Sequence, residues 1–422
     1  MTNILPENYP TNRDSRVNWP LAALIALVPI QNIYLGKIPS LGGGINILNV
    51  LMLVAFLVAS ARRETTYRTP LNRYIVFLGT SYLFSLVIAI SVLGWDEKSP
   101  FILKDMFFSY LFFFVTYKSI TGMKSLKIYL WATIIPLPYM FKVFYSNLSW
   151  MGFSSYQDKL RSNSGTFMNL GSNEIAAFYA TYTFVILGIV LTESEKKRKW
   201  FLLACIAMNA YSLIYSFSRG GYLAILAGCL VYCWYSNKIR QLLAVIVMAI
   251  ALQIAGVDVF PKAVTERFSS SFVENEEMDE GAQTRLILWQ IAIDKFVGSP
   301  LVGVGFGNFK KLNEYKLDSH NYYVKLLAEG GVISFSAFIA FLIASYRTTL
   351  TLFKTTDDVF MAKLSLGFLA CIAALAVGNL FGDRFTHYPL ISYFYVYLAM
   401  IIKGLDWSVD EQQQPGINLT TY

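Results

Sequence analysis

The side chain best suited to move a proton in this sequence is that of His320, one of only two histidines in 422 residues. It opens the segment HNYYVKLLAEGGV, residues 320–332, at the head of a long apolar run. An imidazole changes charge near neutral pH, so a neutral histidine can accept a proton from a hydroxyl group. A histidine in this place can also cap a helix or fill an interface, and the sequence leaves both interpretations open.

Arg219 is the clearest candidate for binding an anion. It lies in SFSRGGYLA, residues 216–224, and is followed by Gly220 and Gly221. Two glycines allow close approach to the backbone at a helix start, and a guanidinium group binds phosphate oxygens through two hydrogen bonds. A lone arginine here could simply extend from a helix end to the membrane surface. A polyanion site is favoured by further ionisable residues expected on the same side: Arg161, Arg285, Arg384 and His387.

The sequence offers few residues suited to other kinds of chemistry. All four cysteines fall inside apolar runs, which is typical of small buried residues rather than of disulfides or zinc ligands. The sequence has no phosphate-binding loop of the kind used by nucleotide hydrolases, no paired carboxylates within an apolar run and no histidine-rich cluster. We therefore expect neither a metal ion nor a cofactor.

The elements that must position these residues are apolar. The chain is 55% hydrophobic and only 15% charged, whereas soluble domains carry about 25% charged residues. Several runs approach the roughly 20 residues that cross a bilayer, and none alternates as a barrel strand would. We predict an all-α polytopic membrane protein with about twelve transmembrane helices. The predicted spans are 20–35, 44–60, 73–93, 101–117, 126–146, 173–192, 200–217, 220–236, 239–256, 320–346, 360–380 and 388–403.

Lysine and arginine are unevenly distributed between alternate loops, as in EKKRK at 195–199. The positive-inside rule makes the basic loops cytoplasmic, together with both termini. The net charge of +8 then reflects loops that meet anionic membrane lipids, and no nucleic-acid partner is expected. Arg161, Arg219, Arg285, Arg384 and both histidines fall on the opposite side, where ionisable groups kept against the charge trend are functional candidates.

One long outer loop is predicted. Its middle is acidic and solvated, whereas TRLILWQIAIDKF, residues 284–296, is too short to span and predicts an interfacial helix with Arg285 in its first turn. The glycines of GSPLVGVGFGNF, 298–309, predict a tight turn that serves either ligand approach or chain re-entry. The chain is thus divided into helices one to nine over 1–256, the loop over 257–319, helices ten to twelve over 320–403 and a cytoplasmic tail over 404–422.

The segments SFSRGGYLA, GVGFGNF and HNYYVKLLAEGGV, in this order around a large loop, resemble the O-antigen ligase family. In that family a histidine after the loop heads a helix with the pattern H-N-x-x-x-x-x-x-E-x-G, which here matches His320, Asn321, Glu329 and Gly331. The resemblance implies a GT-C-like membrane glycosyltransferase of the bacterial inner membrane. Such an enzyme transfers polysaccharide from undecaprenyl diphosphate to lipid A–core at the periplasmic face, with inversion and without a metal.

The resemblance also implies roles for individual residues. His320 would be the general base for the acceptor hydroxyl, and Arg219 and Arg285 would bind the diphosphate. Glu329 is not expected to orient His320, because nine helical residues separate them and place them on opposite faces. An ion pair between Asp383 and Arg384 is an alternative to a substrate contact. The expected substrate-binding residues are Arg161, Gly220, Asn321, Tyr322, Arg384 and His387.

Other functions fit parts of the pattern. O-antigen polymerases and protein O-oligosaccharyltransferases resemble the same motifs and use the same kind of donor. A transporter for an anionic solute would also account for twelve spans, but it predicts an internal repeat and polar residues near mid-bilayer. Neither is evident in the sequence, and the unusual charges lie on one side.

Overall fold

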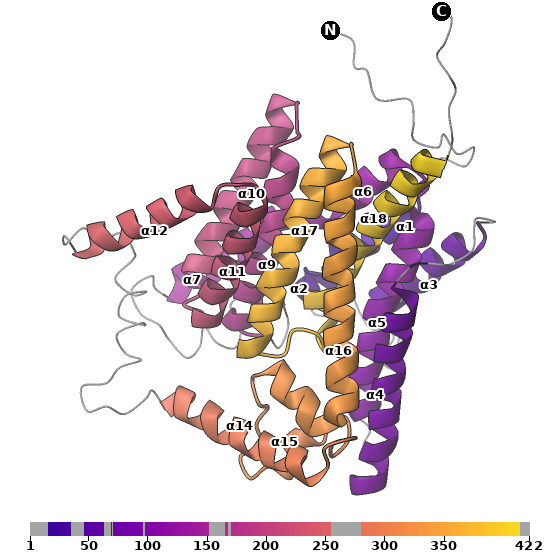
Figure 1. The fold of residues 1–422 in the computed structure, drawn as a ribbon, viewed down its shortest axis with the longest axis vertical. Helices are drawn as coiled ribbons and strands as arrows, with labels where there is room; N and C mark the ends of the chain where they lie inside the picture. The colour runs from indigo at the N-terminus through magenta and orange to yellow at the C-terminus, as the bar shows by residue number, and fades with distance from the viewer. Residues whose placement is uncertain are drawn as a thin grey trace, which may run out of the picture.

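The computed structural model describes residues 16–34, 46–62, 69, 71–95, 98–151, 165–167, 170–254 and 280–413. Within these ranges the regular structure is entirely helical (Figure 1). Every predicted apolar span contains a helix, which confirms the all-α class. Six helices are long and apolar enough to cross a membrane, which indicates a multi-pass membrane protein; the count of twelve spans stays a prediction. The six are Asn72–Leu93, Met123–Trp150, Ser172–Val190, Tyr322–Thr355, Val359–Phe381 and Tyr388–Ser408.

Prolines divide two of the predicted spans. The first consists of α1 (Trp19–Leu27) and α2 (Gln31–Tyr34), and Pro29 lies between them. The fifth consists of α6 (Met123–Ile134) and α7 (Leu137–Met151), separated around Pro136. Proline lacks the N–H that a continuing helix requires, so each break follows from the sequence.

Small residues bring α9 (Ser172–Val190) and α17 (Val359–Gly378) into backbone contact. A Cβ atom on Gly188 would lie 2.3 Å from the carbonyl oxygen of Lys363, and one on Gly367 would lie 2.4 Å from that of Phe184. The third helix of this group, α11 (Arg219–Tyr235), packs against both. Glycine permits this close packing between apolar helices, as is typical of membrane bundles.

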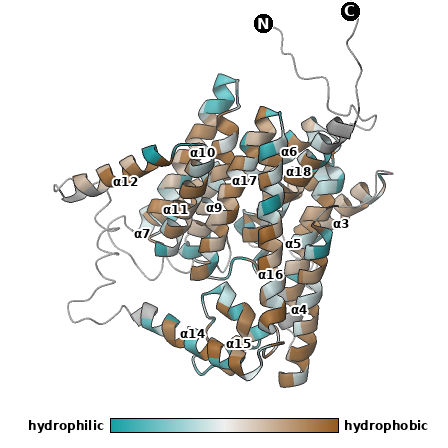
Figure 2. Cartoon of the chain, viewed as in Figure 1, coloured by the Kyte–Doolittle hydropathy of each residue, from teal (hydrophilic) through white to brown (hydrophobic). Residues whose placement is uncertain are grey.

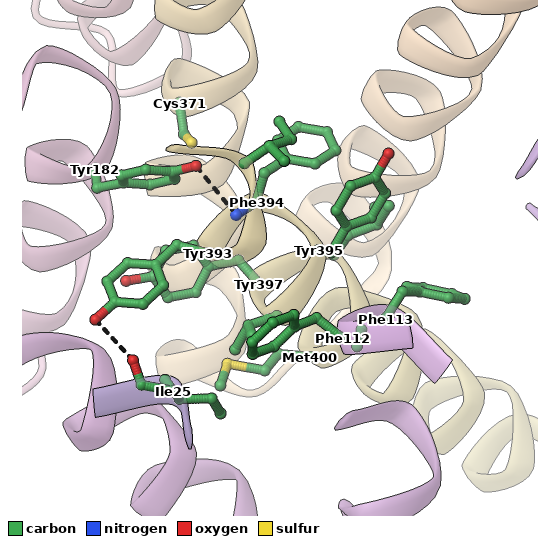
Figure 3. Close-up of a cluster of buried hydrophobic side chains, with 14 of the residues drawn as sticks. Ile25, Phe112, Phe113, Tyr182, Cys371, Tyr393, Phe394, Tyr395, Tyr397 and Met400 are labelled. Carbon is green, nitrogen blue, oxygen red and sulfur yellow. Dashed lines mark hydrogen bonds between the residues drawn. The ribbon is translucent and has the colours of Figure 1, made fainter. Parts of the chain in front are cut away.

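Tyrosines fix α18 (Tyr388–Gln413) in the core (Figure 3). The hydroxyl of Tyr182 donates to the carbonyl of Leu390 and accepts from the amide of Phe394 at 3.2 Å, while Tyr393 donates to the carbonyl of Ile25 at 3.1 Å. The helix runs ten residues past its predicted end at 403, because Trp407 is still buried. The span therefore extends past its predicted end at 403, while the cytoplasmic tail predicted over 404–422 stays a prediction.

The remaining bundle helices are α3 (Ile47–Ser60), α4 (Asn72–Leu93), α5 (Lys98–Ser119), α10 (Lys196–Ile214) and α12 (Ile239–Ile254). α5 packs against α18, and α4 packs against the long helix α16. α12 extends sideways from the bundle (Figure 1). Apolar residues predominate along most of the helices in Figure 2, as is typical of helices that cross a membrane.

The helix α16 (Tyr322–Thr355) folds back on itself. Gly331 inside it has φ 59° and ψ −162°, which is not helical, and the ring of Tyr322 lies 4.9 Å from that of Phe338. In a straight helix these two residues would be about 24 Å apart. Residues 322–330 therefore form a short helix that packs against the longer segment after the bend. The prediction of one continuous span from 320 to 346 was wrong for its first part.

The glycine-rich turn fits into this bend. The amides of Val304 and Gly305 donate to the carbonyls of Ala328 (2.8 Å) and Glu329 (2.9 Å), and the amide of Phe306 donates to that of Ser85 (3.0 Å) in α4. Three positive φ angles in this turn, at Gly303, Gly305 and Gly307, explain the repeated glycine. The turn thus packs against α4 and α16, and both predicted uses of this segment, ligand approach and chain re-entry, stay predictions.

Two helices of the long loop lie across one end of the bundle (Figure 1), namely α14 (Glu280–Gly298) and the single turn α15 (Phe309–Leu312). The helix predicted at 284–296 is therefore present. It begins four residues earlier, so Arg285 lies in its second turn and not in its first. The side chain of Glu329 accepts a hydrogen bond from the amide of Phe309 at 3.2 Å, so it is directed at α15, in agreement with the expectation that it does not orient His320.

Candidate active site

The starts of several helices meet around the connection between α17 and α18. Arg384 of this connection pairs with Glu174 in the first turn of α9, with 2.6 Å between Nη1 and Oε1. Gly220 in the first turn of α11 packs against Phe381, since a Cβ atom there would lie 2.6 Å from that of the phenylalanine. The folded-back part of α16 is attached to α17 by a hydrogen bond of 2.8 Å from Tyr323 Oη to the Ala376 carbonyl. Segments far apart in sequence thus form one site.

His320 occupies a strained turn directly before α16. Its φ of 52° lies in the left-handed region, which is uncommon for residues other than glycine and persists only where the surroundings fix it. The surroundings here are specific. Asn321 caps the helix by accepting from the amides of Tyr323 (3.0 Å) and Val324 (3.3 Å), and Trp289 of α14 donates to the Ser319 carbonyl at 2.9 Å. The side chain of His320 remains exposed.

Charged neighbours act on the imidazole of His320. Although part of the ring reaches solvent, the surrounding chain removes some of its water, and this loss is the largest cause of a lowered pKa. The positive charge of Arg285 is the next cause in the same direction, while Asp318 and Glu174 oppose it and Arg384 adds to it. The ring is therefore neutral at neutral pH and able to accept a proton, and Arg285 lies near it.

Arg384 is buried, with 3% of its side chain exposed, and its partner is Glu174. The alternative pairing of Arg384 with Asp383 was wrong. Asp383 instead accepts hydrogen bonds from the amides of Phe385 (3.2 Å) and Thr386 (3.1 Å). Its ion-pair partner is Lys325. The Arg384 guanidinium is thus held rigidly by a carboxylate from α9.

Lys325 forms two ion pairs beside this site. Its Nζ lies 2.9 Å from Asp318 Oδ2 and 2.9 Å from Asp383 Oδ2. Burial is the largest single influence and acts to raise the pKa of Asp318, but the charge and hydrogen bond of Lys325, together with His320 and the Ser319 amide, hold this pKa below its usual value. Sequence reasoning missed Lys325, Asp318 and Glu174 as members of the site, although Lys325 follows His320 by only five residues.

Arg219 begins α11 at the same end of the bundle. Ser218 caps the helix by accepting from the Gly221 amide at 3.2 Å, and Phe217 before it has a left-handed φ of 53°. Arg219 is half-buried. The space beside Gly220 is filled by Phe381, so this glycine serves helix packing in the structure, and its predicted contact with substrate stays a prediction.

Other predicted site residues have different environments. Tyr322 is buried, with its hydroxyl 2.6 Å from that of Tyr82 and its ring stacked on Phe385 at 5.7 Å. His387 is half-buried, and its carbonyl accepts from the Leu390 amide at 2.9 Å where α18 begins. Arg161 lies outside the described residues. Their roles in binding substrate, like that of the capping residue Asn321, stay predictions.

The comparison with known families agrees with this arrangement. Residues 201–339 match the family model described as O-antigen ligase, a region that includes Arg219, Arg285 and His320. No curated protein matches the chain. The matched region begins in α10 and ends inside α16, so it includes both the glycine-rich turn and the bend at Gly331. The chain therefore carries an O-antigen ligase family domain at residues 201–339.

Proposed function

We propose that the protein is a metal-independent, inverting glycosyltransferase that transfers O-antigen polysaccharide from undecaprenyl diphosphate to a sugar of lipid A–core. The observation that carries this proposal is the exposed imidazole of His320, whose pKa is lowered by loss of water and by the nearby Arg285, inside the region that matches the O-antigen ligase family model. The proposed setting is the bacterial inner membrane, with cytoplasmic termini and the site at the periplasmic face. The proposed orientation rests on the distribution of basic loops, and the proposed membrane rests on the resemblance to the O-antigen ligase family.

In the proposed reaction, a hydroxyl oxygen of the acceptor sugar attacks the anomeric carbon of the donor. The bond from this carbon to the diphosphate oxygen breaks, and undecaprenyl diphosphate leaves with the bonding electron pair. His320 takes the proton of the acceptor hydroxyl. Arg219 and Arg285 bind the diphosphate and stabilise the negative charge that grows on it, which is most effective where water is scarce. Displacement from the opposite face inverts the anomeric centre.

A substitution that preserves the left-handed backbone conformation at position 320 tests the role of the imidazole by itself. Asparagine tolerates a left-handed φ better than most residues but cannot act as a base near neutral pH. With purified lipid A–core and lipid-linked glycan, we expect His320→Asn and His320→Ala to abolish transfer while donor binding is retained. Arg219→Ala and Arg285→Ala should weaken both donor binding and glycan transfer. Lysine at either position should restore only part of the lost binding and transfer. Near-normal transfer by His320→Asn would refute the assignment of a general base.

The acceptor separates the candidate functions. A polymerase of the same superfamily uses the same donor but lengthens a second lipid-linked glycan. Supplying both acceptors to the same preparation distinguishes the two: polysaccharide joined to lipid A–core supports the ligase, and longer chains confined to undecaprenyl diphosphate support the polymerase. A product on protein would favour the oligosaccharyltransferase, and uptake of an anionic solute into liposomes without glycan transfer would favour a transporter.

A further inference from the structure

Lys325 joins the two segments that carry the base and a buried arginine. Its side chain is 14% exposed and contacts a carboxylate on each side, Asp318 and Asp383, at 2.9 Å. Asp318 stands two residues before His320, and Asp383 directly precedes Arg384. One ammonium group thus connects the turn before α16 to the connection between α17 and α18.

The turn at His320 depends on this link. Asp318 Oδ1 accepts from the Ser319 amide at 2.8 Å, while its other oxygen binds Lys325. The hydroxyl of Ser319 then donates to the carbonyl of Asn321 at 2.9 Å. Because a left-handed histidine is held only by its surroundings, release of Asp318 would free the residue that begins this turn.

We propose that Lys325 is a positioning residue for the transfer reaction, because it holds His320 and Arg384 in one fixed arrangement through its two carboxylate partners. The inference rests on the proposed function. Lys325 also sets the local charge. With it, the group of Asp318, Lys325 and Asp383 has a net charge of −1; without it, the charge is −2.

Substitution of Lys325 by methionine tests both effects, since methionine keeps the length of the side chain and removes its charge. Displacement of the base should lower the maximal rate about tenfold to a hundredfold. The uncompensated charge of Asp318 should also raise the pH at which activity falls on the acid side, by about one unit, because it favours the protonated imidazole. The exposed Lys310 provides the matched control, and Lys310→Met should retain the wild-type rate and pH profile.

The pH at which activity falls on the acid side of the pH profile depends on the charged groups that face His320 from every neighbouring element. These are Arg285 of α14, Glu174 of α9, Arg384 of the connection between α17 and α18, and Asp318 of its own segment. Of these four groups, only Asp318 loses its ion-pair partner in Lys325→Met. A lysine that merely stabilised the fold would lower the amount of active enzyme and leave the pH profile in place.

The double variant Asp318→Asn/Lys325→Met separates position from charge and leaves the cluster with its original net charge of −1. We expect its acid limb to return to the wild-type pH while its maximal rate stays low. Wild-type rate and pH profile in Lys325→Met, or a wild-type maximal rate in the double variant, would overturn this inference. Absence of glycan transfer by the wild-type protein would instead overturn the proposed function. Unfolding midpoints of all variants in detergent identify any loss of folded protein.

Discussion

The glycine-rich turn gives a prediction whose size follows from the structure. Gly305 has φ +95°, and a Cβ atom built on it would lie 2.3 Å from both the amide nitrogen and the Cα atom of Ala89 in α4. Both obstacles are backbone atoms and cannot rotate away. Gly298, seven residues earlier, has no atom within 4 Å of its Cβ position. Replacing each glycine by alanine therefore compares a filled position with an open one.

Two costs add at Gly305. A left-handed conformation costs a residue with a Cβ atom about 1–2 kcal/mol, and overpacking against backbone costs about 1–3 kcal/mol, so we expect Gly305→Ala to lose about 2–5 kcal/mol. The turn could instead leave α4, but it would then lose the hydrogen bonds from Phe306 to the Ser85 carbonyl and from Asn308 to the Ala89 carbonyl, at about 1 kcal/mol each. Either outcome moves the bend of α16 and with it His320.

Thermal unfolding followed by circular dichroism in detergent, combined with the transfer assay, measures both consequences. Gly305→Ala should unfold at a lower temperature than wild type and transfer less glycan. Gly298→Ala should unfold at the wild-type temperature or slightly above it, because alanine is the better helix former at the end of α14. Equal midpoints for the two variants would refute the close packing of the turn against α4.

Two further predictions concern the charges. Transfer should fall as the pH drops through the lowered pKa of His320, so the fall should occur at a more acidic pH than an ordinary imidazole would give. Arg285→Ala removes a positive charge and raises this pKa, so the fall should move to higher pH. The residual transfer rate of the variant, measured against pH, tests this shift. Glu174→Gln leaves the buried Arg384 without its carboxylate and should lower the free energy of unfolding by about 3–5 kcal/mol. Glu195→Gln, which removes an exposed ion pair, should lower it by at most about 1 kcal/mol. Equal unfolding midpoints for the two variants would contradict this difference.

Apolar runs and breaks were sufficient to place the helices. Each predicted span contains a helix because backbone polar groups in lipid must be paired internally, which leaves few alternatives. The fold-back of α16 was not predicted, since residues 322–330 continue the apolar run and only Gly330 and Gly331 mark the bend. The end of α18 was missed for a related reason. Its polar residues suggested a tail, but Trp407 is buried by tertiary packing that no local pattern reveals.

Residue type alone suggested the main candidates for the site, whose roles stay predictions. A scarce histidine and arginines on the sparsely charged side pointed to His320, Arg219 and Arg285. Their partners were not predictable, because Glu174 is 210 residues from Arg384 and Asp383 is 58 residues from Lys325. Such pairs depend on how helices meet in three dimensions, and a single sequence does not show which carboxylate meets which cation.

The attachment of the glycine-rich turn to α4 also sets the order in which the protein can be completed during synthesis. Ser85 Oγ donates to the carbonyl of Glu329, 244 residues later, and the carbonyl of Ala89 accepts from Asn308, 219 residues later. Chains emerge from the ribosome with the N-terminal part first, so this end of α4 exists long before its partners do. A chain that stalls before Arg384 also lacks the partner of Glu174. Such a chain also lacks α18, so it contains only the earlier helices of the bundle, and the site can be assembled only after α18 has been made.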